Sequence, residues 1–141
     1  METDKNGSFG QRRSIEIARM WLEELQSCVR SVDYARCRAI VAEDVVGFGS
    51  KAAMVIGIKA LEEEQWRHVW PNIRNFTFLI EQMHCGSGGD DVIWIACPWT
   101  SEGQGAGGTW IARPGRMSVI LERRNGRWLA VHSHHSLAPA S

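Results

Sequence analysis

Residues 115–139, GRMSVILERRNGRWLAVHSHHSLAP, decide the fold of this chain. Two runs rich in β-branched and apolar residues flank the dipeptide Asn125-Gly126. Asn-Gly favours the tight type I′ turn of a β-hairpin, because both central positions of that turn need a positive φ. The sequence therefore predicts two antiparallel strands here, within residues 109–124 and 127–137, joined by a two-residue turn.

The residues before this hairpin divide into a helical half and a strand half. Residues 75–84 and 91–102 keep the two-residue period of strands, and the glycine-rich stretches CGSGGD and GQGAGG mark turns between the strands. Three segments repeat apolar side chains every three or four positions, as amphipathic helices do. They are residues 14–32, 34–43 and 58–73, with a short strand expected over 44–50. Helices followed by hairpins predict an α+β domain, with three N-terminal helices on one face of an antiparallel sheet.

The strand expected over residues 91–102 is apolar on both of its faces. One face carries Val92, Trp94 and Ala96, and the other carries Ile93, Ile95, Cys97 and Trp99. An antiparallel strand with one wet face would alternate between apolar and polar residues. Because the three helices can cover only one face, we expect the other face to meet a second copy of the chain, giving a homodimer through the sheet.

Length and composition limit the classes of protein that this chain can belong to. With 141 residues, of which 44% are hydrophobic and 23% charged, the chain suits one globular domain. We assign this domain to residues 12–139, after a disordered or mobile head over residues 1–11. Sixteen basic residues balance sixteen acidic ones, so the chain has no broad positive field for nucleic acid or an anionic membrane.

The expected location is the cytoplasm. The first ten residues, METDKNGSFG, are polar and contain no apolar signal core, and no run approaches the roughly 18 apolar residues of a membrane span. The four cysteines form no CxxC pair, and a chain of this size can build a core without disulfides. We therefore expect them to be reduced thiols.

Three stretches of this chain carry a family resemblance: VRSVDYARCRAIVAEDVVGFGS, VIGIKALEEEQW and GRMSVILERRNGRWLAVHSHHSLAP. Together with the order of elements they resemble the nuclear transport factor 2-like superfamily, and within it the SnoaL-like branch. The resemblance covers about residues 12 to 139. The ending RRNGRW…VHSHHS…P also looks like the association domain of calmodulin-dependent kinases. The superfamily implies a cystatin-like cone of three helices in a curved antiparallel sheet, with a hydrophobic pocket inside and dimers made through the sheet.

Members of this superfamily include ketosteroid isomerase, scytalone dehydratase, polyketide cyclases and non-catalytic binding modules, so the fold does not settle the function. The resemblance allows a check of the isomerase residues by position. The general-base aspartate falls near Gly49, the tyrosine near Leu25, and the oxyanion-hole acid near Ser118 or Ile120. None of these is acidic or phenolic, which argues against steroid isomerisation by that mechanism.

The last predicted strand carries three of the five histidines of the chain. Alternation places Leu129, Val131, Ser133 and His135 on one face, and Trp128, Ala130, His132 and His134 on the other. By resemblance to the kinase association domains, we expect Ser133 and His135 at the pocket. His132 and His134 would then face the outer side of the sheet or the dimer contact, with a helix-facing His132 as the competing assignment.

Aromatic residues are expected to line much of the pocket. Trp66 and Trp70 are four positions apart and share one face of the third helix. The predicted lining is Trp21, Leu25, Phe48, Trp66, Trp70, Val131, Ser133 and Arg116. Arg113 and Arg116 bracket Pro114-Gly115, and either could meet a carboxylate or phenolate at the pocket mouth. The alternative is an aromatic core without a hollow.

The histidines also raise the possibilities of metal binding and proton transfer. His132 and His134 have a spacing that lets two imidazoles on one strand reach one ion, with His84 or His68 as a third ligand. No second ligand motif accompanies them, so we predict neither a metal nor a cofactor. For proton transfer, a histidine would need an orienting carboxylate at about 3 Å. The candidate partners are Glu81, Asp91 and Glu102.

Two functions remain open. The first is a domain that binds a small hydrophobic ligand in a cone-shaped pocket, without steroid-isomerase-type catalysis. The alternative is an isomerase, cyclase or dehydratase that acts on a small hydrophobic carbonyl compound, with His135 or His132 as general acid/base. The missing isomerase carboxylate favours the first.

Overall fold

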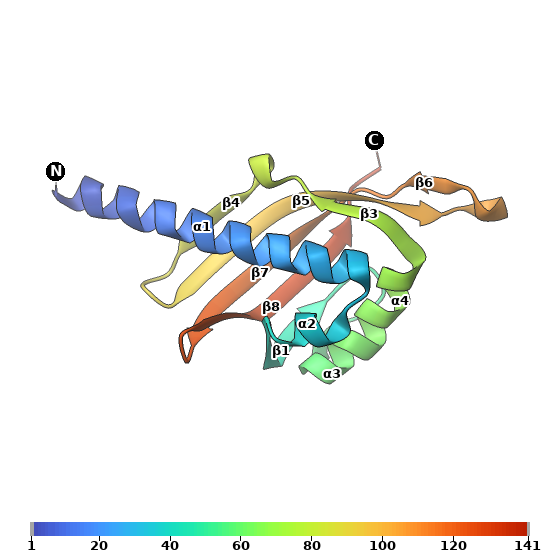
Figure 1. Ribbon diagram of the computed structural model, residues 1–141, viewed down its shortest axis with the longest axis horizontal. Coiled ribbons are helices and arrows are strands. Elements are labelled where there is room, and N and C mark those ends of the chain that lie inside the picture. The colour runs from blue at the N-terminus through green and yellow to red at the C-terminus, as the bar shows by residue number, and fades with distance from the viewer. Residues whose placement is uncertain (1, 141) are drawn as a thin grey trace.

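The computed structural model describes the backbone of residues 2–140 and the side chains of residues 10–140. Its first helix, α1 (Glu2–Ser31), lies along one face of a curved sheet (Figure 1). The helix begins earlier than the periodicity predicted, so the backbone of residues 2–11 is helical as well. Whether this head is mobile stays a prediction. Leu22, Leu25, Cys28 and Val29 are buried toward the sheet, as expected for one apolar stripe.

The second helix is shorter than the sequence predicted. α2 spans only Tyr34–Arg38, with Asp33 as its N-cap, whose carboxylate accepts a hydrogen bond from the backbone N–H of Arg36 at 3.1 Å. The residues that follow join the sheet as β1 (Val41–Phe48). The predicted helix 34–43 therefore ends early, because Val41 and Val45 bury β-branched side chains on the sheet rather than on a helix.

The third predicted helix is one continuous helical segment with a wide turn inside it. It consists of α3 (Ile58–Leu61), the π-helical η1 (Glu62–Trp66), α4 (Arg67–Val69) and the 3₁₀ turn η2 (Trp70–Asn72). Its buried positions are 61, 62, 65, 66, 69 and 70. In a regular α-helix, residues four apart are about 40° out of line. The wider π turn offsets this drift and keeps these side chains on one face.

The sheet contains eight strands in the order β2-β1-β8-β7-β5-β3, and β4 and β6 also pair with β5. Besides β1, the strands are β2 (Val55–Ile56), β3 (Ile73–Phe78), β4 (His84–Ser87), β5 (Val92–Gln104), β6 (Trp110–Ala112), β7 (Gly115–Arg124) and β8 (Arg127–Leu137). The short turns η3 (Ile80–Gln82) and η4 (Ala106–Gly108) connect some of them. The expectation of a wholly antiparallel sheet is wrong in one place, because β1 runs parallel to β8.

The hairpin predicted around Asn125-Gly126 is confirmed. Both residues have positive φ values, 53° and 75°, and Arg124 pairs with Arg127 across the turn. Further along, the register of β7 and β8 shifts, since Ile120 pairs with His132 while Leu121 pairs with Ala130. Val131 is therefore an extra residue, a β-bulge, and it reverses which alternate residues of β8 face the helices.

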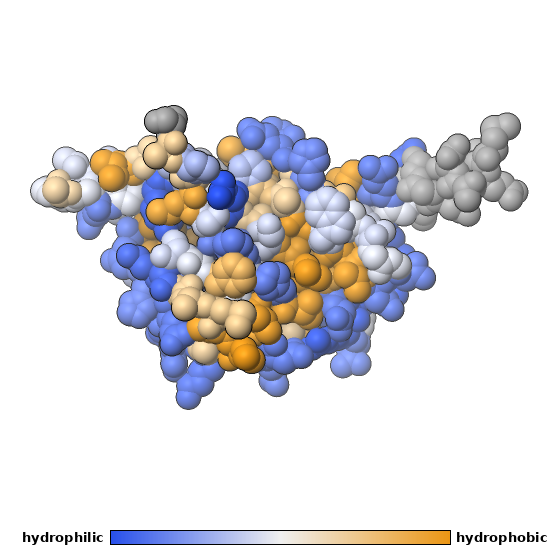
Figure 2. All heavy atoms as spheres, turned by 180° about the vertical axis from the view of Figure 1, so that it is seen from behind, coloured by the Kyte–Doolittle hydropathy of each residue, from blue (hydrophilic) through white to orange (hydrophobic). Residues whose placement is uncertain are grey.

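The hydrophobic core lies between α1 and the concave face of the sheet, with the helical segment 58–72 closing one end (Figure 1). Leu22, Val45, Ile95, Val119 and Leu121 are among its fully buried side chains. The other face of the sheet, here called the outer face, carries Trp94 of β5, Ile120 of β7, and His132 and His134 of β8. Figure 2 shows apolar side chains gathered on the side of the molecule away from α1. No helix within residues 2–140 is both long and apolar enough to cross a membrane.

Candidate functional site

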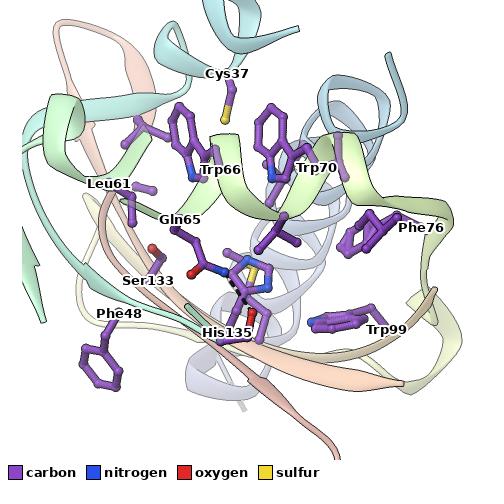
Figure 3. Close-up of a pocket in the computed structure, with 18 of the residues that line it drawn as sticks. Cys37, Phe48, Leu61, Gln65, Trp66, Trp70, Phe76, Trp99, Ser133 and His135 are labelled. Carbon is purple, nitrogen blue, oxygen red and sulfur yellow. Dashed lines mark hydrogen bonds between the residues drawn. The ribbon is translucent and has the colours of Figure 1, made fainter. Parts of the chain in front are cut away.

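A cavity of about 40 Å³ lies inside the cone, under the helical segment 58–72 (Figure 3). This cone cavity is lined by Trp21, Leu25, Val29, Cys37, Val41, Phe48, Ser50, Leu61, Gln65, Trp66, Val69, Trp70, Ile73, Phe76, Trp99, Arg113, Met117, Ala130, Ser133 and His135. Most of these side chains are apolar, and the polar ones come from the loop after β1, the helical segment, the residues before β7, and β8. The cavity is thus a narrow, largely aromatic space with a few convergent polar groups.

The helical side of the cavity is a stack of aromatic rings. The centroids of Trp66 and Trp70 are 5.1 Å apart, and Tyr34 stacks on Trp70 at 5.3 Å. The guanidinium of Arg67 lies 4.3 Å from the centroid of Tyr34 on the solvent side, which continues the stack with a cation–π contact. Glu62 holds this end in place by accepting hydrogen bonds from Arg38 and Arg67, and the bond from Arg38 holds the pKa of its carboxyl below the usual range. The helix therefore presents a rigid wall.

Trp99 of β5 forms the sheet side of the cavity, opposite this stack. Its ring lies across Gly115 of β7, where a Cβ atom would approach the indole Cζ2 to 2.2 Å, so only glycine permits this position. Trp99 is 2% exposed, and its Nε1–H has no hydrogen-bond partner among the described residues. An unpaired buried donor costs about 1–3 kcal/mol, which makes this N–H available to an acceptor that enters the cavity.

Arg113 and its neighbours form the polar end of the cavity. The Nη2 of Arg113 donates to the Oγ of Ser50 at 3.1 Å, and the Nε2 of Gln65 donates to the same oxygen at 3.1 Å. Gln65 in turn accepts hydrogen bonds from the backbone N–H groups of Lys51 and Ala52. The guanidinium of Arg113 lies 5.3 Å from the Trp99 centroid, and burial lowers its pKa. No carboxylate within the described part of the chain forms an ion pair with Arg113.

His135 borders the same end of the cavity, and its ring centroid is 5.9 Å from that of Trp99. Burial lowers its pKa to about 4, with further lowering from the positive charge of Arg113 and from His134. The imidazole is therefore neutral at pH 7. None of the carboxylates proposed as orienting partners bonds to it, since Asp91 pairs with Arg123 and Glu102 binds Arg74, while Glu81 has no hydrogen bond to His135 within residues 10–140.

The other two histidines of β8 lie on the outer face. His132 Nδ1 donates to the carbonyl oxygen of Val46 at 2.8 Å, and the ring centroid of His134 lies 4.1 Å from that of Phe48, with the two rings tilted by 42°. Among the described side chains, no group of three or more His, Cys, Asp or Glu residues is placed to hold a metal ion. Both imidazoles make contacts with β1, His132 with Val46 and Phe48, and His134 with Phe48.

The structure brings most of the predicted pocket residues together. Those that border the cone cavity are Trp21, Leu25, Phe48, Trp66, Trp70, Ser133 and His135. Phe48 does so from its edge, because its ring points away from the other labelled side chains (Figure 3) and contacts His132 and His134 of the outer face. His132, Val131 and Arg116 do not border it. Val131 is the bulged residue, and Arg116 is exposed because the inward positions of β7 are Gly115 and Met117.

Four residues that bring polar groups to the cavity were not in the predicted lining: Ser50, Gln65, Trp99 and Arg113. Gln65 could have been found from its position, because it shares the helical face of Leu61 and Val69 and is a polar residue in an apolar stripe. Trp99 has the inward parity of Ile95 and Cys97. From the sequence, either Arg113 or Arg116 could reach the pocket mouth. In the structure Arg113 lines the cone cavity and Arg116 does not.

A second hollow, of about 460 Å³, adjoins the cone cavity and shares Val69, Ile73 and Arg113 with it. The remaining lining of this mouth groove is Lys51, His68, Asn72, Gly103, Gln104, Ile111, Ala112, Pro114, Leu137 and Ala138. It lies between the end of the helical segment 58–72 and the residues that connect β5, β6 and β7. Arg113 therefore stands between a narrow interior and a roomier groove open to solvent.

The model of the SnoaL-like domain family matches residues 18–141 of this chain. The chain belongs to the SnoaL-like domain family. Its fold is that of the nuclear transport factor 2-like superfamily, as the sequence had suggested. A comparison with curated proteins found no match.

Solved structures with the same fold have diverse descriptions. A nuclear transport factor 2-like protein of unknown function from Pseudomonas putida KT2440 is 23% identical, with a TM-score of 0.71 over 88% of this chain and 85% of that one. The association domain of CaMKII from C. elegans is 14% identical, with a TM-score of 0.65 over 93% and 98%. A ketosteroid isomerase-like protein from Erwinia carotovora atroseptica is 12% identical, with a TM-score of 0.76 over 89% and 97%. At these identities the comparisons establish the fold alone.

The cavity of this SnoaL-like domain is poorly equipped for carboxylate-based proton transfer. None of the side chains that line it, within the residues described, is acidic. At Gly49, where the resemblance places the isomerase base, a Cβ atom would lie 2.6 Å from the amide carbon of Gln65. An aspartate could not be accommodated there without displacing Gln65. The chemistry that remains is hydrogen-bond donation from Arg113, Trp99 and Ser50, beside a neutral imidazole.

Proposed function

We propose that this SnoaL-like domain binds a small, largely apolar molecule in its cone, without steroid-isomerase-type catalysis. The observation that carries the proposal is the unpartnered indole N–H of Trp99, which is buried in the aromatic wall of a hollow. A purely structural core would leave a cost of about 1–3 kcal/mol uncompensated at this atom. A ligand with one hydrogen-bond acceptor would satisfy it.

The size of the cavity limits the ligand. A space of about 40 Å³ has room for a few water molecules or a very small organic molecule. Drug-sized ligands occupy pockets of about 300–1,000 Å³. A larger ligand would therefore extend into the mouth groove of about 460 Å³, past Arg113.

An isomerase, cyclase or dehydratase acting on a small hydrophobic carbonyl compound is the second candidate, because His135 does border the cavity. Two observations weigh against it. The pKa of His135 is lowered to about 4, so the neutral ring accepts a proton poorly near pH 7. The described residues also provide no carboxylate that would orient the ring.

The proposal includes a homodimer formed through the outer face. Trp94 is 48% exposed there, and Ile120 and His132 continue the patch across β7 and β8 in register. A tryptophan left half in water beside further apolar side chains is typical of a covered surface. We also propose a cytoplasmic location, which the four free cysteines support.

Ligand binding can be tested by nuclear magnetic resonance with acetone and acetonitrile as probes, because each is very small and carries one hydrogen-bond acceptor. Either probe should shift the indole N–H signals of Trp66, Trp70 and Trp99 in a saturable way. The signal of Trp94, on the outer face, should stay in place and serves as the internal control. The proposal fails if no probe moves the three cavity signals, or if all four indole signals move together without saturation.

A further inference from the structure

The chemistry of the ligand can be inferred from the hydrogen-bonding capacity at the junction of the two hollows, provided that the proposed binding function holds. Ser50 Oγ accepts hydrogen bonds from both Gln65 and Arg113. A hydroxyl oxygen has two acceptor sites, so the hydrogen of Ser50 is left to donate elsewhere. Trp99 Nε1–H is an unused donor as well. The amide oxygen of Gln65 already accepts two hydrogen bonds.

The junction therefore has an excess of donors. Arg113 carries five N–H bonds, and among the described side chains it forms one hydrogen bond, from Nη2 to Ser50. The neutral His135 and the hydroxyl of Ser133 also line the cone cavity, and each can accept a hydrogen bond but also brings a donor of its own. A ligand group that fits here must accept several hydrogen bonds at once. A carboxylate does so, because it has two oxygens and donates none.

The charges around the junction also favour a carboxylate ligand. Arg113 has no carboxylate partner within residues 10–140, and Lys51 and His68 border the mouth groove beside it. Neither hollow is lined by an acidic side chain in the part of the chain that the structure describes. The positive charge of Arg113 also contributes to the lowered pKa of His135. An anion at this point would neutralise a half-buried guanidinium that forms no ion pair within residues 10–140.

The mouth groove offers an apolar surface next to this charge. Val69 and Ile73 form one side, and Ile111 and Leu137 form another part of the lining. Ile111 is 54% exposed and Leu137 is 49% exposed, although both are large aliphatic side chains. The inner cavity is too small for an extended hydrocarbon, whereas the groove of about 460 Å³ has the room.

We propose that the ligand is a small monocarboxylate whose carboxylate group points inward to Arg113, Trp99 and Ser50. Its apolar body lies in the mouth groove, against Val69, Ile73, Ile111 and Leu137. The planar guanidinium holds the two oxygens in a fork, which a lysine cannot reproduce. The interior of the cone then receives only the head of the ligand.

The test uses hexanoate and its neutral isostere hexanamide, followed by calorimetry and by the indole N–H signal of Trp99. Hexanoate should bind at least tenfold more tightly than hexanamide and should move the Trp99 signal downfield, as a new hydrogen bond to a carboxylate does. Acetate, which has the head without the body, should bind at least tenfold more weakly than hexanoate.

The variant Arg113→Met should remove the preference for hexanoate, because methionine keeps most of the unbranched stem without the charge. Arg116→Met is the matched control, since Arg116 is exposed and bonds only to Ser136 Oγ among the described side chains. Arg113→Lys keeps the positive charge, so it should keep part of the preference for hexanoate. This variant therefore separates the loss of the charge from a general loosening of the loop at Ser50.

The outcomes separate this inference from the binding function itself. Equal affinity for hexanoate and hexanamide, or an unchanged preference in Arg113→Met, would overturn the carboxylate assignment, while binding of acetone would still support the cone as a ligand site. A preference lost equally in Arg116→Met would also overturn it, because the effect would then come from surface charge in general. If acetone and acetonitrile fail to bind but hexanoate shows the dependence on Arg113, the binding of a largely apolar molecule in the cone is refuted and the carboxylate assignment stands.

Discussion

His135 should make the stability of this protein sensitive to acid. Its pKa is lowered to about 4 in the folded protein, mainly by burial, against an ordinary value of 6.5. The unfolded chain therefore binds the proton more readily than the folded chain between these two values. The contribution of His135 to the stability is fully present above about pH 6.5. It is lost as the pH falls toward 4, because protonation of the imidazole favours the unfolded state.

The size of this effect follows from the shift. A difference of one pKa unit corresponds to about 1.4 kcal/mol, so His135 accounts for a loss of about 3 kcal/mol between pH 7 and a pH below 4. At pH 5 the loss is about 2 kcal/mol, since the unfolded imidazole is then almost fully protonated while the folded one is still neutral. This is a large part of the 5–15 kcal/mol typical of a small domain.

Urea unfolding of the wild type and of His135→Phe at pH 7 and pH 5 measures the effect directly. Phenylalanine keeps a ring of similar size but takes up no proton, so the free energy of unfolding of the variant should fall by about 2 kcal/mol less between the two pH values. His84→Gln removes an exposed imidazole and should behave as the wild type does. If His135→Phe loses as much stability as the wild type, the imidazole is not held neutral, and the argument against it as a proton acceptor loses its basis.

Three further substitutions test other parts of the structure. Glu62→Gln should destabilise the fold by about 1–2 kcal/mol in urea unfolding, because two arginines lose a nearly buried carboxylate, whereas the exposed Glu63→Gln should cost almost nothing. Trp94→Glu should convert a dimer to a monomer in sedimentation, while Met20→Glu on the exposed side of α1 should not; a wild type that sediments as a monomer refutes the dimer. Gly115→Ala should lower the stability by about 1–3 kcal/mol or prevent folding, because its methyl group would collide with the indole ring beside it, and a neutral effect in thermal unfolding would contradict the packing.

Local patterns were enough to predict most of the fold. Asn125-Gly126 located the last hairpin because the turn it forms depends on only two residues. The two-residue period located β5 and β8 within two residues of their observed ends, whereas the run predicted over residues 109–124 consists of two strands, β6 and β7. Trp66 and Trp70 were assigned to one face of their helix from spacing alone, and they stack there.

The features that were missed depend on contacts between distant residues. β1 runs parallel to β8, and the sequence of a single strand does not determine which neighbouring strand it pairs with. The bulge at Val131 adds one residue to β8, so alternation counted from Leu129 gives the wrong face until the bulge is passed, while Ser133 and His135 were placed correctly relative to each other. Arg113 lies inward and Arg116 outward because of the path of the chain around Pro114, which periodicity does not describe.

The π turn in the helical segment 58–72 bears on how this chain tolerates changes of length. The inward residues 61, 65 and 69 are spaced four apart, and so are 62, 66 and 70. If one of the exposed residues Glu63 and Glu64 were removed, the first spacing in each set would become three and the second would stay four. Residues with these spacings lie on one side of an ordinary α-helix. A deletion in most helices turns every later side chain by about 100°. Here the shortened helix would keep its tryptophans stacked over the cavity, so natural variation in the length of this family should concentrate at this turn.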